Sequence, residues 1–283
     1  VSAHAAGDPE NGRSALDAVE LMNTGVQYLR EHMTSDCRVH YAIIDAGGVS
    51  PNVVQSEASV LYMVRANKVR DSVKLLARVD KIAQGAALMT ETGFDRQFID
   101  GTAELVPNYT LEELLYRIFN EVGLPEYTAG ERQLAEALRK TYDVTTAPGI
   151  AAGFDADIAA DVAERTNGLS DALCGFIMPE YHSTGFVAGS TDDGDVSWQT
   201  PAAQVHCVTF PFGAAGHSWQ NVSCGGTSLG HKGLINAAKI IACAAIELMN
   251  DPDTLQKARD EFARRTKGGY VCPIEPDAVP TAI

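Results

Sequence analysis

The sequence of 283 residues predicts an α/β protein whose first part, residues 1–106, has a ferredoxin-like fold. Two observations favour this fold: segments with apolar residues three and four apart alternate with short β-branched runs, and their order is β-α-β-β-α-β. The composition agrees, because 45% hydrophobic and 21% charged residues are typical of an ordered globular protein. We therefore expect one large domain or two small ones.

In the first part, the clearest predicted element is a helix from Ser14 to about Glu31, in which Ser14 and Asp17 form a capping-box-like start. Residues 38–45 alternate between apolar and other residues, as a half-buried strand does, and a pair of glycines breaks the pattern. Helical spacing returns at 69–92. The remaining predicted elements are extended: the end of a strand at 1–6, a strand within 53–65 and a last run at 94–106.

The second part, residues 107–283, mixes helices and short strands with glycine-rich loops. Residues from 143 to about 170 are rich in Ala and Gly and predict no regular element. This pattern predicts an α/β fold of which the second part contains only a portion. It predicts helices at about 110–120, 130–143, 232–249 and 254–265, and strands at 184–188 and 205–210.

The formal net charge of −15 argues against two classes of partner. Nucleic acids and anionic membranes would both repel such an acidic surface, so we expect a small molecule or another protein instead. We find no apolar run of the roughly 18 residues that a membrane span needs, and no signal segment. The six cysteines are scattered, which is typical of a reduced, cytoplasmic protein.

Two candidate binding sites lie in the first part. His4 stands among small residues at the end of a predicted strand, where its side chain could reach a ligand; an ordinary surface histidine is the alternative. Asn52 follows the glycine turn, and Arg65 ends the next predicted strand. An amide donor and a bidentate guanidinium suit a carboxylate, although a turn residue and a strand-end charge explain the pattern as well.

The second part offers an anion-binding loop and a pair of histidines. Residues 189–191 follow an apolar run and could present N–H groups and hydroxyls to an anion, unless they form a solvated acidic turn. His217 and His231 lie in loop surroundings that suit zinc, or they pack locally. Residues 226–230 match a serine-hydrolase motif, but the polar segment before them lacks the buried strand that this motif requires.

Four phrases, taken in order, resemble the M20 family of metallopeptidases and amidohydrolases. They are Ser-Ala-His-Ala-Ala-Gly at 2–7, Gly-Arg-Ser-Ala-Leu-Asp-Ala-Val-Glu-Leu-Met at 12–22, Gly-Ser-Thr-Asp-x-Gly-Asp-Val-Ser-Trp at 189–198 and His-Ser-Trp-Gln at 217–220. The resemblance extends over essentially the whole chain. It implies a ferredoxin-like lid and dimerisation domain at 1–106 and, at 107–283, the C-terminal portion of a zinc-peptidase-like α/β catalytic domain.

The resemblance also implies roles for the candidate residues of the first part. His4 matches the lid histidine that reaches into the partner subunit's active site and stabilises the oxyanion of the tetrahedral intermediate. Asn52 and Arg65 match the pair that binds the free carboxylate of the substrate. These three residues would therefore act on the substrate without touching the metal.

For the second part, the resemblance implies that Gly189, Ser190 and Thr191 also contact the substrate carboxylate. His217 matches the last ligand of one or two divalent ions, zinc first and manganese as the alternative. In the family the other ligands and the general-base glutamate precede the lid. We therefore expect them in a segment before residue 1, and expect this chain alone to be inactive.

The implied activity is hydrolysis of the amide bond of an N-acyl amino acid by metal-activated water. The first expected substrate is p-aminobenzoyl-glutamate or a similar aromatic acyl-glutamate. The enzyme would be a homodimer, or a heterodimer with a related subunit, joined through the lid. Two alternatives stay open: an M20 dipeptidase or aminoacylase of another specificity, and a non-catalytic dimerisation or binding module.

Overall fold

The computed structural model describes residues 1–147, 155–183, 185, 187 and 189–279, and these divide into two compact units. Unit 1 comprises Val1–Glu104, Ser190–Asp195 and the residues from Tyr270 onward. Unit 2 comprises Leu105–Gly189 and Val196–Gly269. Each unit is thus assembled from segments that are far apart in the sequence.

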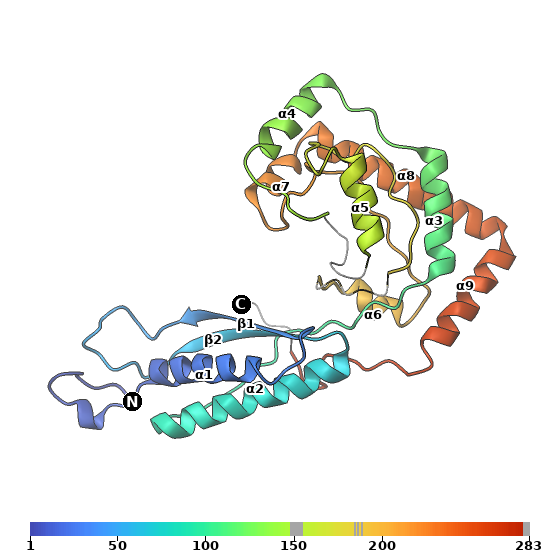
Figure 1. Ribbon diagram of the computed structural model, residues 1–283. Coiled ribbons are helices and arrows are strands. Elements are labelled where there is room, and N and C mark those ends of the chain that lie inside the picture. The colour runs from blue at the N-terminus through green and yellow to red at the C-terminus, as the bar shows by residue number, and fades with distance from the viewer. Residues whose placement is uncertain (148–154, 184, 186, 188, 280–283) are drawn as a thin grey trace. The chain divides into compact units, whose positions relative to one another are not determined.

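Unit 1 places two helices against a two-stranded sheet (Figure 1). The strands are antiparallel, and the register pairs Arg38 with Arg65 at one end and Asp45 with Ser59 at the other. The small sheet and the covering helices confirm the predicted α/β class in coarse form. The elements are η1 (Pro9–Asn11), α1 (Ala15–Arg30), β1 (Arg38–Asp45), β2 (Ser59–Arg65) and α2 (Val69–Thr90).

The core of unit 1 lies where α1 and α2 meet the sheet. Val26 of α1, Val39 of β1 and Val79 of α2 are almost fully buried in one cluster. The apolar spacing of α1 gives it the inward face, and the Ser14 side chain caps its first turn by accepting from the Asp17 N–H at 3.1 Å. The first predicted helix is therefore confirmed, including its cap.

Two of the predicted strands of the first part are absent from the described residues. Residues 94–106 contain no strand, because no neighbouring strand lies beside them; instead the Ala103 N–H donates to a carboxylate of Asp195 at 3.0 Å. Residues 1–6 contribute a single antiparallel bridge between His4 and Val53. The predicted four-stranded arrangement is thus reduced to a two-stranded sheet with one bridge beside it.

Unit 2 is mostly helical among its described residues. Leu114 and Ile118 of α3 pack against Ile240 and Ala244 of α8, which forms the main core cluster. The helices are α3 (Tyr109–Val122), α4 (Ala129–Arg139), α5 (Ala156–Arg165), α7 (Trp219–Cys224), α8 (Ser228–Asn250) and α9 (Pro252–Arg265), while α6 (Asp193–Ser197) crosses the boundary between the units.

The four helices predicted for the second part are confirmed as α3, α4, α8 and α9. The sequence missed α5, which lies in the Ala- and Gly-rich stretch, and the short helices α6 and α7. The predicted strand at 205–210 is wrong, since no strand is assigned there. Of the predicted strand at 184–188, residues 184, 186 and 188 lie outside the described residues.

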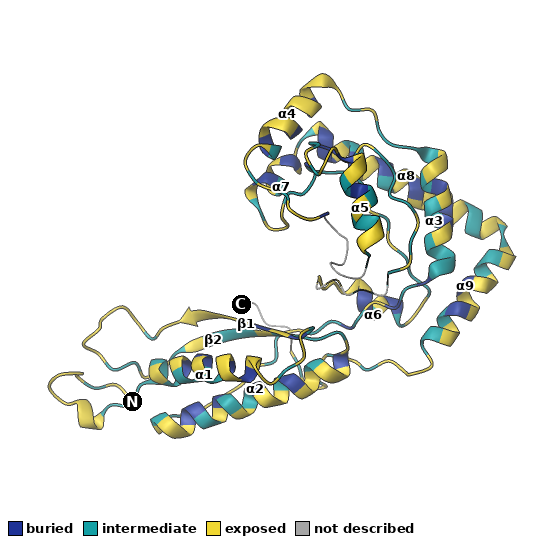
Figure 2. Ribbon diagram, in the orientation of Figure 1, coloured by how far each residue is buried: buried dark blue, intermediate teal, exposed yellow. Residues whose placement is uncertain are grey.

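The helix α8 has both buried and exposed residues (Figure 2), and the exposed ones include large apolar side chains. By length and composition it could cross a membrane, contrary to the expectation that no apolar run is long enough, although core helices of soluble proteins share this property. Ile240 and Ala244 are buried in unit 2. The exposed large apolar residues of α8 are Leu234, Ile235, Ile241, Ile246 and Met249.

Candidate functional site

His4 has its ring fixed by its own loop. Its Nδ1 atom accepts the backbone N–H of Ala6 at 3.2 Å and that of Gly7 at 2.9 Å. An imidazole nitrogen that accepts hydrogen bonds carries no proton, so the neutral His4 ring carries its proton on Nε2. The side chain is exposed, and Nε2–H is therefore a donor available to a ligand.

Backbone pairing brings His4 next to Asn52. The Ala5 N–H donates to the Asn52 carbonyl at 2.9 Å, and the Val54 N–H donates to the Ala3 carbonyl at 3.0 Å. These two bonds flank the bridge between His4 and Val53. Two of the three lid residues predicted from the sequence thus lie on adjacent segments of unit 1.

Arg65 is not brought to this position. It ends β2, whereas Asn52 lies before β2, beyond the Ser59 end of the strand. At about 3.3 Å per residue, the strand separates Ser59 from Arg65 by about 20 Å. The Arg65 guanidinium lies against the Met63 sulfur, at 3.3 Å from Nε. Within one chain, Asn52 and Arg65 therefore do not form the adjacent pair that the sequence suggested.

The loop residues Ser190 and Thr191 are exposed and lead into α6. The Thr191 carbonyl accepts the Gly194 N–H at 3.1 Å, and the Asp193 N–H lies 3.3 Å from the Thr191 hydroxyl oxygen. Gly189 is exposed as well but belongs to unit 2, whereas Ser190 and Thr191 belong to unit 1. The predicted three-residue loop is thus divided by the unit boundary.

His217 has a strained backbone. Its φ of 60° lies in the left-handed region, which few residues other than glycine adopt, and its side chain is exposed. It directly precedes Ser218, whose side chain caps α7 by accepting from the Asn221 N–H. Such strain is retained mostly where the surrounding structure or function requires it, and His217 shares it with Glu91, Asn167 and Leu169.

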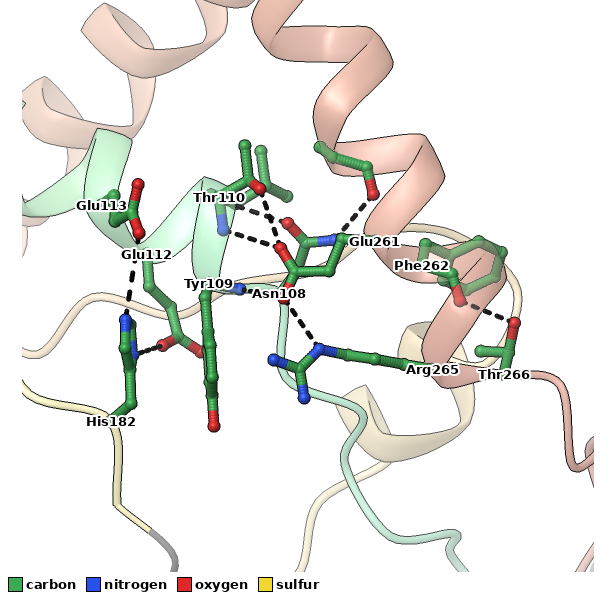
Figure 3. Close-up of polar contacts among 12 residues, drawn as sticks. Asn108, Tyr109, Thr110, Glu112, Glu113, His182, Glu261, Phe262, Arg265 and Thr266 are labelled. Carbon is green, nitrogen blue, oxygen red and sulfur yellow. Dashed lines mark hydrogen bonds and ion pairs between the residues drawn. The ribbon is translucent and has the colours of Figure 1, made fainter.

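The start of α3 carries a dense polar cluster that the sequence did not predict (Figure 3). The buried Glu261 of α9 accepts the N–H groups of Tyr109 and Thr110 at 3.0 and 2.9 Å, together with the Thr110 hydroxyl. Arg265 donates to the same carboxylate at 2.8 Å. Burial opposes ionisation of Glu261, but these donors outweigh it and lower its pKa to about 2.

His182 joins this cluster from a distant segment. Its ring stacks on Tyr109 with centroids 3.7 Å apart, and the Arg265 guanidinium lies 4.0 Å from the Tyr109 ring. Nδ1 of His182 lies 3.3 Å from the Glu112 carboxylate, and Nε2 lies 4.0 Å from that of Glu113 (Figure 3). Burial raises the pKa of Glu112, and the neighbouring His182 counteracts part of that rise.

Among the described residues, the group of potential metal ligands is Glu113, Glu180 and His182, whose ligand atoms lie within 4.8 Å of one another. Two ligands of one zinc ion, each at about 2.2 Å, can be at most about 4.4 Å apart. Nε2 of His182 and the Glu113 carboxylate, 4.0 Å apart, lie within that limit, but all three side chains are exposed, and ion pairs of His182 with Glu112 and Glu113 account for its contacts. His217 is not part of this group, so the described residues do not complete a catalytic metal site around it.

The cluster at α3 could not be read from the sequence because its members are far apart in the chain. Glu261 lies 151 residues from Thr110, and His182 has no apolar periodicity or motif around it. The one available signal was Asn108, a typical helix N-cap, whose side chain accepts the Leu111 N–H at 3.1 Å. That signal predicts where the helix begins but does not identify its partners.

Comparison with known proteins adds the context of longer chains. Residues 1–90 match the peptidase dimerisation domain family, M20_dimer. The whole chain is 40% identical over 290 residues to a subunit of the p-aminobenzoyl-glutamate hydrolase of Escherichia coli (strain K12), and it covers 59% of that protein. It is also 26% identical over 267 residues to Xaa-Arg dipeptidase of Mus musculus; this match covers 92% of the chain and 48% of the dipeptidase.

The chain thus spans roughly half to three fifths of the length of the curated relatives that it matches. A solved structure, the aminobenzoyl-glutamate utilization protein from Klebsiella pneumoniae, is 24% identical, with a TM-score of 0.37 over 44% of this chain and 31% of the other. At this TM-score the likeness supports no conclusion on its own.

Proposed function

We propose that the chain is part of an amidohydrolase, because residues 1–90 match a peptidase dimerisation domain family and the whole chain is similar to part of a known amidohydrolase. The proposed reaction is the hydrolysis of the amide bond of an N-acyl amino acid. The first proposed substrate is p-aminobenzoyl-glutamate, because the relative with 40% identity bears that name.

The observation that carries the proposal is the state of His4. Its Nδ1 accepts two backbone N–H groups, so the proton of the neutral ring sits on the exposed Nε2. Hydrolysis of an amide builds negative charge on the carbonyl oxygen, and a donor fixed in advance stabilises that charge without reorganising. A lid histidine with this tautomer is suited to that role.

The neighbouring Asn52 suits the other end of the substrate. Because Ala5 and the Asn52 carbonyl share a hydrogen bond, the two segments keep a fixed distance from each other. An amide side chain can donate to a carboxylate, so Asn52 would hold the free carboxylate of the amino acid. Arg65 lies at the far end of β2 and would therefore have to act at a separate position from Asn52 of the same chain.

We assign His217 as the metal ligand of this chain, supported by its exposed side chain and strained backbone. A catalytic zinc takes about three protein ligands, so the remaining ones must come from outside the described residues. The chain's own contribution to the chemistry is then to bind the substrate carboxylate and to stabilise the oxyanion. A second protomer, identical or related, would join through residues 1–90.

The test is hydrolysis by the complete protein in the presence of zinc or manganese, measured as p-aminobenzoate released from p-aminobenzoyl-glutamate. The matched comparison is p-aminobenzoyl-glutamine amide, which has the same acyl group but no free carboxylate. We expect cleavage of the first compound and at least a tenfold lower kcat/KM for the second. Cleavage of Xaa-Arg dipeptides alone would indicate a dipeptidase instead. If neither p-aminobenzoyl-glutamate nor Xaa-Arg dipeptides are cleaved, the chain would be a dimerisation or binding module.

A further inference from the structure

Asp195 connects three segments of unit 1 through one carboxylate. Its Oδ2 atom accepts the backbone N–H of Ala103 at 3.0 Å, and its Oδ1 atom accepts the Tyr270 hydroxyl at 2.7 Å. Burial, and then the hydrogen bond to Asp195, raise the pKa of Tyr270 above its usual range, so the phenol keeps the proton that it donates. One side chain thus holds together segments 92 and 75 residues away in sequence.

The position of these contacts along the chain is informative. The chain passes from one unit to the other after Glu104, after Gly189, after Asp195 and before Tyr270. Asp195, Ala103 and Tyr270 each lie within two residues of one of these passages. The carboxylate therefore joins three of the four places where the chain passes between the units.

Gly194 adds a second, independent restraint. It is buried, and a Cβ built on it would lie 2.0 Å from the Ala103 carbonyl oxygen. No side chain fits into this space, so the backbone of Gly194 packs directly on that of Ala103. The same residue donates its N–H to the Thr191 carbonyl at 3.1 Å, which links the packed residue to the exposed loop.

The pattern continues on the other side of the boundary. Within unit 2, the Val106 N–H donates to the hydroxyl of the fully buried Ser197 at 2.8 Å. Each unit thus has one backbone N–H held by a side-chain acceptor, Ala103 by Asp195 in unit 1 and Val106 by Ser197 in unit 2. A backbone N–H that pairs with a side chain in this way is not available for a sheet, so neither Ala103 nor Val106 donates to a neighbouring strand.

We propose that Asp195 is a positioning residue: by holding Ala103 and Tyr270, it makes segment 190–195 a part of unit 1 and so fixes Ser190 and Thr191 in position to contact the substrate carboxylate. The part of this inference that concerns the substrate rests on the proposed function. The part that concerns the attachment of segment 190–195 to unit 1 does not depend on the proposed function. Loss of the Asp195 carboxylate releases the segment from unit 1 and leaves the rest of that unit folded.

The experiment is amide hydrogen exchange on the full chain, followed by mass spectrometry, for Asp195→Ala, Tyr270→Phe and the control Asp17→Asn. Asp17 is an exposed carboxylate of unit 1 in the first turn of α1. The Ala103 amide loses its acceptor directly. The Gly194 amide donates to the Thr191 carbonyl within the segment, so its exchange reports on the segment itself.

We expect the Gly194 amide to exchange about tenfold faster in Asp195→Ala, less so in Tyr270→Phe, and unchanged in Asp17→Asn. The Val39 amide, in the core of unit 1, serves as the folding control. Faster exchange at Ala103 with an unchanged Gly194 would overturn the proposal. If Asp195→Ala also accelerates exchange of the Val39 amide, the variant has disturbed the fold of unit 1. The exchange of the Gly194 amide in Tyr270→Phe, which removes a single hydroxyl, then decides whether the proposal holds.

A second readout concerns the substrate. In the complete enzyme, Asp195→Ala is expected to raise KM for p-aminobenzoyl-glutamate about tenfold and to change KM for the amide without a free carboxylate less than twofold. An equal rise for both compounds would contradict the positioning role. If the unmodified enzyme cleaves neither compound, the proposed function fails, while the exchange of the Gly194 amide still decides whether Asp195 attaches the segment.

Discussion

Gly7 donates its backbone N–H to Nδ1 of His4 at 2.9 Å, and this contact determines which ring nitrogen of His4 is free to donate. The residues between them are small, so the loop can turn back onto the ring that it carries. His4 therefore needs no other side chain to hold its tautomer. Unit 1 therefore presents, at Nε2 of His4, a donor whose orientation is fixed by its own loop.

Replacing this donor should lower turnover more than affinity. In the complete enzyme, His4→Ala is expected to reduce kcat by about 10²- to 10³-fold, which is typical for the loss of one oxyanion donor. Steady-state kinetics on p-aminobenzoyl-glutamate measures the effect, and His40→Ala on β1 is the matched control, with less than a twofold change. A loss confined to KM would assign His4 to substrate binding instead.

Metal binding should depend on His217 and not on His182. In the complete protein, His217→Ala is expected to remove high-affinity zinc, measured by metal analysis after dialysis, and to leave the melting temperature of the apo form within about 2 °C. His182→Ala should retain zinc, because its Nδ1 already faces Glu112. The opposite pattern would move the metal site to Glu113, Glu180 and His182.

Glu261 should make unit 2 sensitive to acid. Its pKa is about 2 in the folded chain and 4.5 in the reference state, so the stability that it contributes is fully present above pH 4.5 and is lost as the pH falls toward 2. Glu261→Gln is expected to lower the free energy of unfolding by about 2 to 3 kcal/mol at pH 7, since it weakens several charge-assisted hydrogen bonds.

Urea unfolding followed by circular dichroism, repeated between pH 7 and pH 2.5, tests this dependence. The difference between the unmodified chain and Glu261→Gln should shrink as the pH falls. Asp260→Asn alters an exposed carboxylate on the same helix, one residue away, and should change stability by less than about 0.5 kcal/mol. A difference that stays constant with pH would show that Glu261 acts through packing and not through its charge.

Two adjacent glycines should differ in their tolerance of a side chain. Gly47 and Gly48 both have positive φ, at 79° and 114°, but a Cβ on Gly47 would lie 2.4 Å from the Glu57 carbonyl oxygen, whereas one on Gly48 would meet nothing within 4 Å. Gly47→Ala is therefore expected to destabilise unit 1 by about 1 to 3 kcal/mol more than Gly48→Ala. Equal melting temperatures would mean that the hairpin relaxes around the added atom.

The elements that could be predicted from the sequence are those that local contacts determine. The helix after Ser14 was predicted because its cap and its apolar face lie within a few residues of each other. The strand at 94–106 was predicted wrongly because a strand needs a neighbour, and Ala103 pairs with Asp195 instead. An extended apolar run does not reveal in advance which acceptor its N–H groups will find.

In the candidate site, too, the sequence revealed local features but not long-range ones. His4, Asn52 and His217 were singled out from short motifs, and the structure adds a fixed tautomer, a backbone bridge and a strained φ that no motif shows. The distance of Arg65 from Asn52 could not be anticipated, because it depends on the register of β1 and β2. Registers and distant ion pairs are long-range properties that residue spacing alone does not specify.

The outward side of α8 has a practical consequence for work with this chain. Molecules with a net charge of −15 repel one another at low ionic strength, which keeps their leucine- and isoleucine-rich helices apart. Salt shortens the reach of that repulsion to about 10 Å at 0.1 M and about 3 Å at 1 M. Concentrated stocks should therefore stay clear in dilute buffer and turn cloudy as salt is added.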